Sequence, residues 1–497
     1  MKVPAPERAT TGVAGLDDIL HGGLLASRLY LIDGNPGSGK TTLALQFLLE
    51  GVRLGERCMY VTLSETRDEL VANAASHGWS LEGLDIFQLT EAEGDAGADG
   101  ELTMLHPSEV ELGQATRRIL DAIERARPAR MVLDSLSELR LLSQSSLRYR
   151  RQILALKQFF DGRHCTVLLL DDRTAEGPDR QLQSIAHGVI SLEHHAPAYG
   201  RTLRQMQVVK FRGSDFRSGY HHIRLRTGGL QVFPRLAAVE HRCEFDTMHV
   251  ESGVPTLDRL LGGGIDIGTS TLLAGPSGAG KSTIALQYAL AAVRRGDHAA
   301  VFAFDESRAT LTARLNALGM HFDEGSGPGQ IAVNQIDPAE ITPGEFAYLV
   351  RQAVERDRAR VIVIDSLNGY VNAMVDGQYL TAQLHELLAY LGNQGVSSFL
   401  IAGQTGLLAG PMGTPGDASY LADTVVFLRF FEYGGKVRKA ISVLKKRSGA
   451  HEDSIRELRF DANGVHLSEP LAALHGVLTG VPVDRPAERG TVEFPHR

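Results

Sequence analysis

The sequence contains few cysteines, a single tryptophan and no long apolar run. Its three cysteines, Cys58, Cys165 and Cys243, lie far apart and form no CxxC pair, which argues against a zinc ribbon or a disulfide framework. We expect them to be small buried apolar residues. No stretch approaches the roughly 20 apolar residues of a membrane span. The start, MKVPAPERATTG, lacks the apolar core of a signal peptide, so we expect a cytoplasmic protein without a membrane-spanning segment.

The charge and the aromatic content argue against a nucleic-acid-binding protein. The formal net charge is −8 and the pI is about 6.1, whereas a sequence-blind DNA binder normally has a basic surface. Trp79 is the only tryptophan, and no basic stretch is interleaved with aromatic residues. With 497 residues, of which 43% are hydrophobic, the chain is long enough for two or more domains.

The chain is a tandem repeat. The stretch TGVAGLDDILHGGLLASRLYLIDGNPGSGKTTLALQF near the start returns as SGVPTLDRLLGGGIDIGTSTLLAGPSGAGKSTIALQY past the middle. Lys40 corresponds to Lys281 and Glu65 to Glu306, both 241 residues apart (281 − 40 and 306 − 65). The later MVLDSL and VIVIDSL are 231 residues apart (365 − 134), so the first half carries about ten additional residues. We assign these to the acidic, Gly-rich residues 90–101, which are typical of a solvated loop.

Short β-branched runs alternate with helical patterns within each half, as in RLYLID, TTLALQFLLEGVRLG and RCMYVTL. This alternation predicts βαβ units and an α/β fold, in which each half is a mostly parallel sheet flanked by helices. Later runs, such as VISLEH and RQMQVVKF, predict an antiparallel β extension. We expect domains at residues 1–238 and 239–467, followed by a Pro-rich, charged and flexible tail at 468–497.

Two Gly-rich stretches fit the pattern GxxxxGK[ST], and each lies between an apolar strand and a helix. Their backbone N–H groups, the helix N-terminus and the lysine are suited to hold the phosphates of a nucleoside triphosphate. A chance Gly-rich turn explains one match but not two within a repeat. We therefore predict an ATP and Mg²⁺ site in each half. The predicted nucleotide-binding residues are Gly34, Asn35, Pro36, Gly37, Ser38, Gly39, Lys40, Thr41, Thr42, Gly275, Pro276, Ser277, Gly278, Ala279, Gly280, Lys281, Ser282 and Thr283.

Two aspartates and two hydroxyl residues are candidate Mg²⁺ ligands. Thr41 and Ser282 end the phosphate loops and supply a hydroxyl oxygen. Asp134 and Asp365 each close an apolar strand before Ser-Leu, the second acidic position of phosphate-loop folds, which holds the metal through its water shell. The alternative is that each aspartate caps the following helix.

Glu65 and Glu306 end the strand that follows each phosphate-loop helix. A carboxylate at this position can accept a proton from the attacking water or orient that water in line with the γ-phosphate. The alternative is a carboxylate that stabilises a helix N-terminus, because SETRDEL and DESRATL both look like helix starts. Both copies keep this glutamate although most neighbouring residues differ, which favours catalysis.

These motifs, together with KFRGSDF, KKRSGAHEDSIREL and GVLTGVP, resemble the KaiC family, a branch of the RecA-like ATPases. The resemblance covers about residues 10–465. It implies tandem RecA-like domains, a two-tiered hexamer with ATP between neighbouring subunits, and a signalling or clock-type role with protein partners. Lys210 with Arg212 and Lys445 with Arg447 match the family's K-x-R residues that reach the neighbour's γ-phosphate. The alternative for these pairs is a basic edge strand.

The two halves differ in one acidic position. Asp305 precedes Glu306, whereas Ser64 precedes Glu65. In the resembling family the paired acids of the second half include the base for autophosphorylation of serine and threonine, whereas the first half chiefly hydrolyses ATP. The resemblance places Ser419 at the family's serine and Tyr420 where a threonine is expected, so Ser419 is a candidate phosphosite. The alternative is a polar residue in a Gly/Pro-rich loop.

Two further hypotheses belong to other functional classes. A DNA-dependent RecA-like motor or recombinase would use the same fold, but the composition above disfavours it. A scaffold that binds ATP without hydrolysis is disfavoured by the two glutamates and the two K-x-R pairs.

Overall fold

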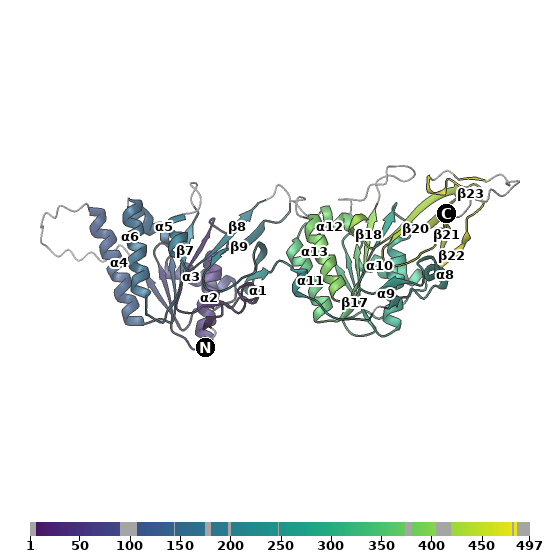
Figure 1. The fold of residues 1–497 in the computed structure, drawn as a ribbon. Coiled ribbons are helices and arrows are strands. Elements are labelled where there is room, and N and C mark those ends of the chain that lie inside the picture. Colours follow the sequence, from purple (N-terminus) through teal and green to yellow (C-terminus); the bar gives the residue numbers. More distant parts are fainter. Residues whose placement is uncertain are drawn as a thin grey trace, which may run out of the picture. The chain divides into compact units, whose positions relative to one another are not determined.

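The computed structural model describes residues 6–89, 107–143, 145–173, 180–196, 200–246, 248–372, 380–403, 419–479 and 482–484. The chain divides into two compact units, Met1–Arg235 and Leu236–Arg497, which we call the first and second domains (Figure 1). Each is described by itself below. The acidic loop expected at residues 90–101 lies outside the described residues.

The first domain is built on a nine-stranded mixed sheet of order β11-β10-β9-β8-β3-β7-β6-β4-β5. The six strands from β8 to β5 run parallel, and the other three extend the sheet antiparallel. The strands are β3 (Leu29–Gly34), β4 (Cys58–Thr62), β5 (Leu84–Gln88), β6 (Arg130–Asp134), β7 (Thr166–Asp172), β8 (Gly188–His195), β9 (Leu203–Phe211), β10 (Tyr220–Arg226) and β11 (Gly229–Phe233).

Helices cover both faces of this sheet, as Figure 1 shows. Alternate residues of β3 separate two cores: Tyr30 and Ile32 pack with α2 and α3, whereas Leu29 and Leu31 pack with α4 and α6. Apolar side chains on both faces explain the nearly continuous apolar strands. The helices are α1 (Ala14–Ile19), α2 (Lys40–Arg53), α3 (Arg67–Ser76), α4 (Pro107–Ala126), α5 (Leu136–Ser143), α6 (Ser146–Phe160) and α7 (Arg180–Ile185).

The second domain repeats this architecture, with sheet order β16-β15-β17-β18-β14-β19-β20-β21-β22. The predicted α/β class, with a mostly parallel sheet and an antiparallel extension, is confirmed in both domains. The elements are β14 (Ser270–Gly275), β15 (His298–Ala303), β16 (Ile331–Gln335), β17 (Ala359–Asp365), β18 (Ser397–Gly403), β19 (Thr424–Tyr433), β20 (Lys436–Lys446), β21 (Arg456–Asp461), β22 (Gly464–Pro470), α8 (Pro255–Leu260), α9 (Lys281–Arg294), α10 (Arg308–Ala317), α11 (Pro343–Glu355), α12 (Leu367–Asn372) and α13 (Leu380–Asn393).

Short elements complete the fold around the predicted boundary and tail. Leu236 and Ala238 are buried in the core of the second domain. Within the predicted tail, Val477 is buried against Phe431 and Ala440, so this part packs on the second domain. The short elements are β1 (Arg8–Ala9), β2 (Leu24–Leu25), β12 (His249–Val250), β13 (Ile265–Asp266), β23 (Leu474–His475), β24 (Val483–Asp484), η1 (Ala238–Glu240) and η3 (Val477–Thr479).

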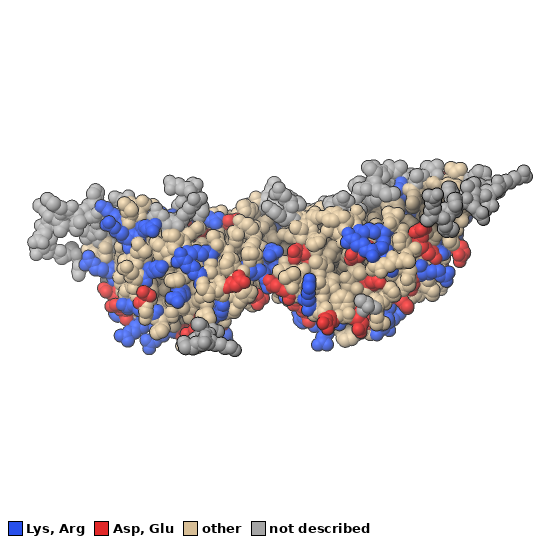
Figure 2. All heavy atoms as spheres, viewed as in Figure 1, with Lys and Arg blue, Asp and Glu red and all other residues tan. Residues whose placement is uncertain are grey.

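In the described part of the chain, no helix is both long enough and apolar enough to cross a membrane. Figure 2 shows that the face in view carries both Lys or Arg and Asp or Glu side chains on each domain. Among the described residues, positive and negative side chains are therefore both present on this face of each domain.

Candidate active site

Each phosphate loop follows a strand that lies between two parallel strands of the sheet. A long helix begins directly after the loop. Lys40 is the first residue of α2, after β3, and Lys281 is the first residue of α9, after β14. Gly39 and Gly280 precede these lysines with φ values of 106° and 108°, a left-handed conformation that glycine adopts without strain. The loops thus place backbone N–H groups at a helix N-terminus, which is a favourable place for an anion.

The two phosphate-loop lysines have different partners. Lys40 Nζ donates to two carbonyl oxygens of its own loop at 2.8 and 3.0 Å, and Lys281 Nζ does the same at 2.8 Å to both. Lys40 also forms an ion pair of 2.7 Å with Asp172, at the end of β7. The corresponding end of β18 is Gly403, so this carboxylate is confined to the first domain.

The candidate Mg²⁺ ligands come together at the carboxyl edge of each sheet. The Thr41 hydroxyl donates to Asp134 Oδ2 at 3.4 Å, and the Ser282 side chain lies close enough to Asp365 to lower the pKa of its carboxyl. Burial raises the pKa of both aspartates, and a hydrogen bond from the Tyr60 hydroxyl opposes this shift at Asp134. Hydroxyl and carboxylate oxygens are the ligands that Mg²⁺ prefers.

These loops fit a bound triphosphate. Ser38 Oγ is completely buried and lacks a hydrogen-bond partner among the described residues. Such a group normally finds a partner, and here phosphate oxygens can supply it. Burial lowers the pKa of the Lys281 ammonium, with Asp365 opposing the shift, so an added anion would stabilise the charged lysine.

Glu65 lies just outside helix α3 rather than at its cap. The N-cap is Thr66, which forms a capping box with Glu69, so the helix end is stabilised without Glu65. Glu65 Oε2 is buried and has no hydrogen-bond partner within the described part of the chain. Burial raises the pKa of Glu65, and Asp134 raises it further. These contacts favour the catalytic interpretation over the helix-cap alternative.

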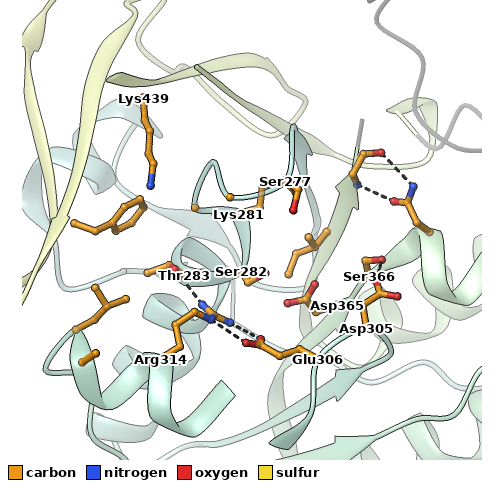
Figure 3. A pocket seen from close by; sticks show the side chains of 18 residues that line it. Ser277, Lys281, Ser282, Thr283, Asp305, Glu306, Arg314, Asp365, Ser366 and Lys439 are labelled. Atoms are coloured by element: carbon orange, nitrogen blue, oxygen red, sulfur yellow. Dashed lines mark hydrogen bonds and ion pairs between the residues drawn. The ribbon is translucent and has the colours of Figure 1, made fainter. Parts of the chain in front are cut away.

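The paired acids of the second domain point away from each other (Figure 3). Glu306 also precedes its helix cap, Ser307, but its carboxylate forms an ion pair of 2.7 Å with Arg314 of α10. Asp305 instead accepts a hydrogen bond from the Ser366 hydroxyl. Both acids lie beside the phosphate loop. The partner of Glu306 is in α10, and the partner of Asp305 directly follows β17.

A cavity of about 650 Å³ joins these groups in the second domain. The phosphate loop, the acids and Ser366 line it. Phe460 also lines it, beside Gly280 of the phosphate loop, and Lys439 Nζ lies 4.9 Å from the centre of the Phe460 ring. The residues lining the cavity are Ser277, Gly278, Gly280, Lys281, Ser282, Thr283, Asp305, Glu306, Arg314, Ala317, Leu318, Asp365, Ser366, Asn368, Ile401, Gly403, Lys439 and Phe460.

The K-x-R pairs lie apart from these residues within their own domains. Lys210 Nζ donates to two carbonyl oxygens of the segment before β8 at 2.6 and 2.7 Å, and Lys445 Nζ donates to two before β19 at 3.1 and 2.7 Å. Arg212 and Arg447 donate to carbonyl oxygens of the same segments at 3.3 and 2.7 Å. Burial lowers the pKa of both lysines, and the neighbouring arginines lower it further.

Strands β9 and β20, which carry these pairs, each have a neighbour on both sides. The outer pairing covers residues 204–207 of β9 and residues 439–441 of β20, so it ends before Lys210 and Lys445. Both interpretations of the K-x-R pairs, contact with a neighbour's nucleotide and protection of a strand edge, therefore stay predictions.

The candidate phosphosite Ser419 borders residues 404–418, which lie outside the described residues. Its carbonyl oxygen is one of the acceptors of Lys445. The next residue, Tyr420, accepts from Arg447 through its carbonyl oxygen and is 52% exposed. The backbone of this segment is thus held by the K-x-R pair of its own domain.

Several contacting residues were not among the sequence candidates, and three of them are Tyr60, Asp172 and Arg314. Each occupies a position where the two repeats differ: Val301 corresponds to Tyr60, Gly403 to Asp172, and Asn73 to Arg314. Aligning the halves position by position would have found them, because a difference beside a shared site alters its electrostatics.

Comparison with known proteins agrees with this geometry. A family model described as "ATPase: KaiC" matches residues 9–237 and again residues 250–472. The circadian clock protein KaiC3 of Synechocystis sp. is 26% identical over 486 residues, covering 96% of this chain and 95% of that protein. The circadian clock oscillator protein KaiC of Acaryochloris marina is 25% identical over 480 residues, covering 95% and 90%. The chain therefore belongs to the KaiC family of ATPases and contains two KaiC domains in tandem.

Proposed function

We propose that both domains bind Mg-ATP and hydrolyse it. The observation that carries this proposal is the same in each domain: a phosphate-loop lysine, a hydroxyl and aspartate pair, and a glutamate outside a helix cap meet at the carboxyl edge of the sheet. Ligands of open α/β sheets bind at this edge.

Different side chains of each site have different roles in phosphoryl transfer. The loop N–H groups with Lys40 or Lys281 bind and orient the phosphates, and Thr41 with Asp134 or Ser282 with Asp365 would hold Mg²⁺. The metal, when bound, neutralises charge that develops on the phosphate oxygens. Glu65 and Glu306 orient the attacking water and accept its proton. In the second domain, the Phe460 ring beside Gly280 offers the nucleoside an apolar surface in the cavity.

The test is steady-state ATP consumption by the full chain and by Lys40→Ala, Lys281→Ala and the double variant. We expect each single variant to lose the ATP turnover of one domain, and we expect the double variant to show only background ATP turnover. Activity that persists in the double variant would contradict the proposal. Single-stranded DNA should leave turnover unchanged, and strong stimulation would instead support the DNA-dependent motor.

We extend the proposal to assembly and cellular role. Cytoplasmic subunits form a double ring, a hexamer, in which the K-x-R pairs of one subunit reach ATP bound by its neighbour. Two relatives of this chain are named circadian clock proteins. We therefore propose that the protein is a clock-type or signalling switch with protein partners. Native mass spectrometry in the presence of a slowly hydrolysed ATP analogue tests the ring, and a monomer under saturating analogue would refute it.

A second candidate activity is autophosphorylation at Ser419. Two observations favour it. Asp305 is an additional acid whose carboxylate accepts from Ser366 rather than from Arg314, and Lys445 donates a hydrogen bond to the backbone carbonyl oxygen of Ser419. Intact mass before and after incubation with Mg-ATP tests it, with Lys281→Ala as the inactive control. A mass gain that is undiminished in Ser419→Ala would exclude this site.

A further inference from the structure

Arg314 engages both carboxylate oxygens of Glu306. Its Nε donates to Oε1 at 3.2 Å and a terminal nitrogen donates to Oε2 at 2.7 Å. The other terminal nitrogen donates to the Thr283 hydroxyl of α9 at 3.2 Å. Figure 3 shows the guanidinium between the glutamate and the phosphate-loop helix. Arg314 thus ties Glu306 to two helices.

The first domain contains no such contact at the corresponding position. Asn73 stands 241 residues before Arg314 (314 − 73), the same spacing that relates Glu65 to Glu306. Glu65 Oε2 is buried and has no hydrogen-bond partner among the described residues. The two domains therefore share a glutamate but differ in whether a cation holds it.

The contact bears directly on the chemistry proposed for Glu306. A group that accepts a proton from water must point a free lone pair at that water. A bidentate arginine directs both oxygens toward itself and fixes the carboxylate in one orientation. With 24% and 30% of the glutamate and arginine side chains exposed, solvent screens the pair in part and it can be broken.

We propose that Arg314 is a positioning residue that restrains Glu306, so that the second domain hydrolyses ATP more slowly than it would with a free glutamate. This inference rests on the proposed role of Glu306 in hydrolysis. It makes the two domains unequal ATPases through a single side chain, independently of the Ser64 and Asp305 difference.

The test compares turnover in a chain whose first site is silenced by Glu65→Gln, which retains the phosphate loop. In that background we expect Arg314→Asn to raise kcat roughly fivefold, the scale of one partly exposed ion pair, with KM unchanged. Arg314→Lys keeps the charge but loses the bidentate fork, so it should raise kcat by less than Arg314→Asn does. Adding Glu306→Gln should remove the gain.

The first domain offers the reciprocal control. Asn73→Arg in a Glu306→Gln background places an arginine at the position equivalent to Arg314, and we expect it to lower kcat by a similar factor. Agreement of both substitutions, in opposite directions, would be inconsistent with a merely structural role for Arg314.

The remaining outcomes separate this inference from the proposed function. If the Glu65→Gln chain consumes ATP but Arg314→Asn leaves kcat unchanged or lower, the inference fails and the proposed function stands. A rise in KM alone would make Arg314 a nucleotide ligand, which also overturns the inference. If neither the Glu65→Gln chain nor its Arg314→Asn variant consumes ATP, hydrolysis by the second domain fails together with the inference.

Discussion

The ammonium group of Lys40 lies 2.7 Å from the carboxylate of Asp172, at the end of the neighbouring parallel strand. A phosphate-loop lysine must turn to the phosphates when a nucleotide binds. In the first domain, Lys40 must break its ion pair with Asp172 to reach the phosphates. The negatively charged phosphates must also approach the Asp172 carboxylate. The ion pair and nucleotide binding are therefore in competition.

We expect Asp172→Asn to strengthen nucleotide binding in the first domain about fivefold. The carboxylate is 39% exposed, so removal of this pair is worth about 1 kcal/mol. Titration of a fluorescent ATP analogue into a Lys281→Ala background measures it, because only the first site then binds. The converse substitution, Gly403→Asp in a Lys40→Ala background, should weaken binding to the second site. Unchanged affinity in Asp172→Asn would show that Lys40 exchanges partners without cost.

Glu65→Gln should abolish hydrolysis in the first domain and spare binding. Glutamine matches the shape of the side chain but cannot accept the proton of the attacking water, and general-base catalysis commonly contributes about 10²- to 10⁴-fold. We expect a loss of at least 100-fold in kcat in a Lys281→Ala background, with the affinity for the ATP analogue within about twofold. Equal losses of binding and turnover would point instead to a structural role.

The activity of the first domain should fall on acidification at a higher pH than an ordinary glutamate would cause. Burial, followed by Asp134, Glu69 and Asp172, raises the pKa of Glu65 above 4.5. The catalytic form is the carboxylate, so turnover is lost as the pH falls through this raised pKa. A kcat profile from pH 5 to pH 8 in the Lys281→Ala background would reveal the acid limb.

Asp172→Asn provides the control for this profile. It removes one negative charge that raises the pKa of Glu65, so the acid limb should move to lower pH. A limb that moves to higher pH in this variant would mean that a group other than Glu65 controls the profile.

The repeat and its periodicity were sufficient to predict the fold class. Both sheets are mostly parallel, as predicted, because short strands alternate with helices in each half and a βαβ pattern leaves few arrangements. The glutamates could be placed beside the loops for the same reason. Their position just before a helix cap left two interpretations, which only the capping contacts of Thr66 and Ser307 could separate.

The ion pairs could not be predicted from either half alone. Lys40 and Asp172 are far apart in sequence and meet because β3 and β7 are adjacent in the sheet. The side chain of Arg314, within α10, contacts Glu306, which lies just before that helix. Such contacts depend on the direction of a side chain from its element, which sequence spacing restricts but does not determine.

Arg130 should be important for the stability of the first domain. Only 1% of its surface is exposed, and it bonds the Glu56 carboxylate and the carbonyl oxygens of Thr10 and Phe47. Because its removal leaves these acceptors unpaired beside a cavity, we expect Arg130→Ala to lower the free energy of unfolding by about 3 kcal/mol or more.

Trp79 makes this measurement specific to the first domain. It is the only tryptophan of the chain and packs against the first domain's core, so its fluorescence in urea reports that domain. Arg53→Ala, which removes an exposed partner of Glu50, is the matched control and should leave the midpoint nearly unchanged. An unchanged midpoint in Arg130→Ala would contradict the prediction.

Lys210 and Arg212 should act on the nucleotide of a neighbouring subunit. Within their own chain both contact backbone carbonyl oxygens rather than the phosphate loop, so a catalytic role requires the neighbour's site. In a Glu306→Gln background, Glu65→Gln and the Lys210→Ala, Arg212→Ala variant should each be inactive, because each lacks one half of every interface.

Co-expression of these two variants at equal amounts should restore activity. In a head-to-tail ring, a productive interface needs Glu65 from one variant and the intact K-x-R pair from the other, which random mixing supplies at about one interface in four. We therefore expect about a quarter of the parent's ATP turnover in the mixture. If the pair acted within its own chain, no subunit of the mixture would hold a complete set, and the mixture would remain as inactive as the two variants measured separately.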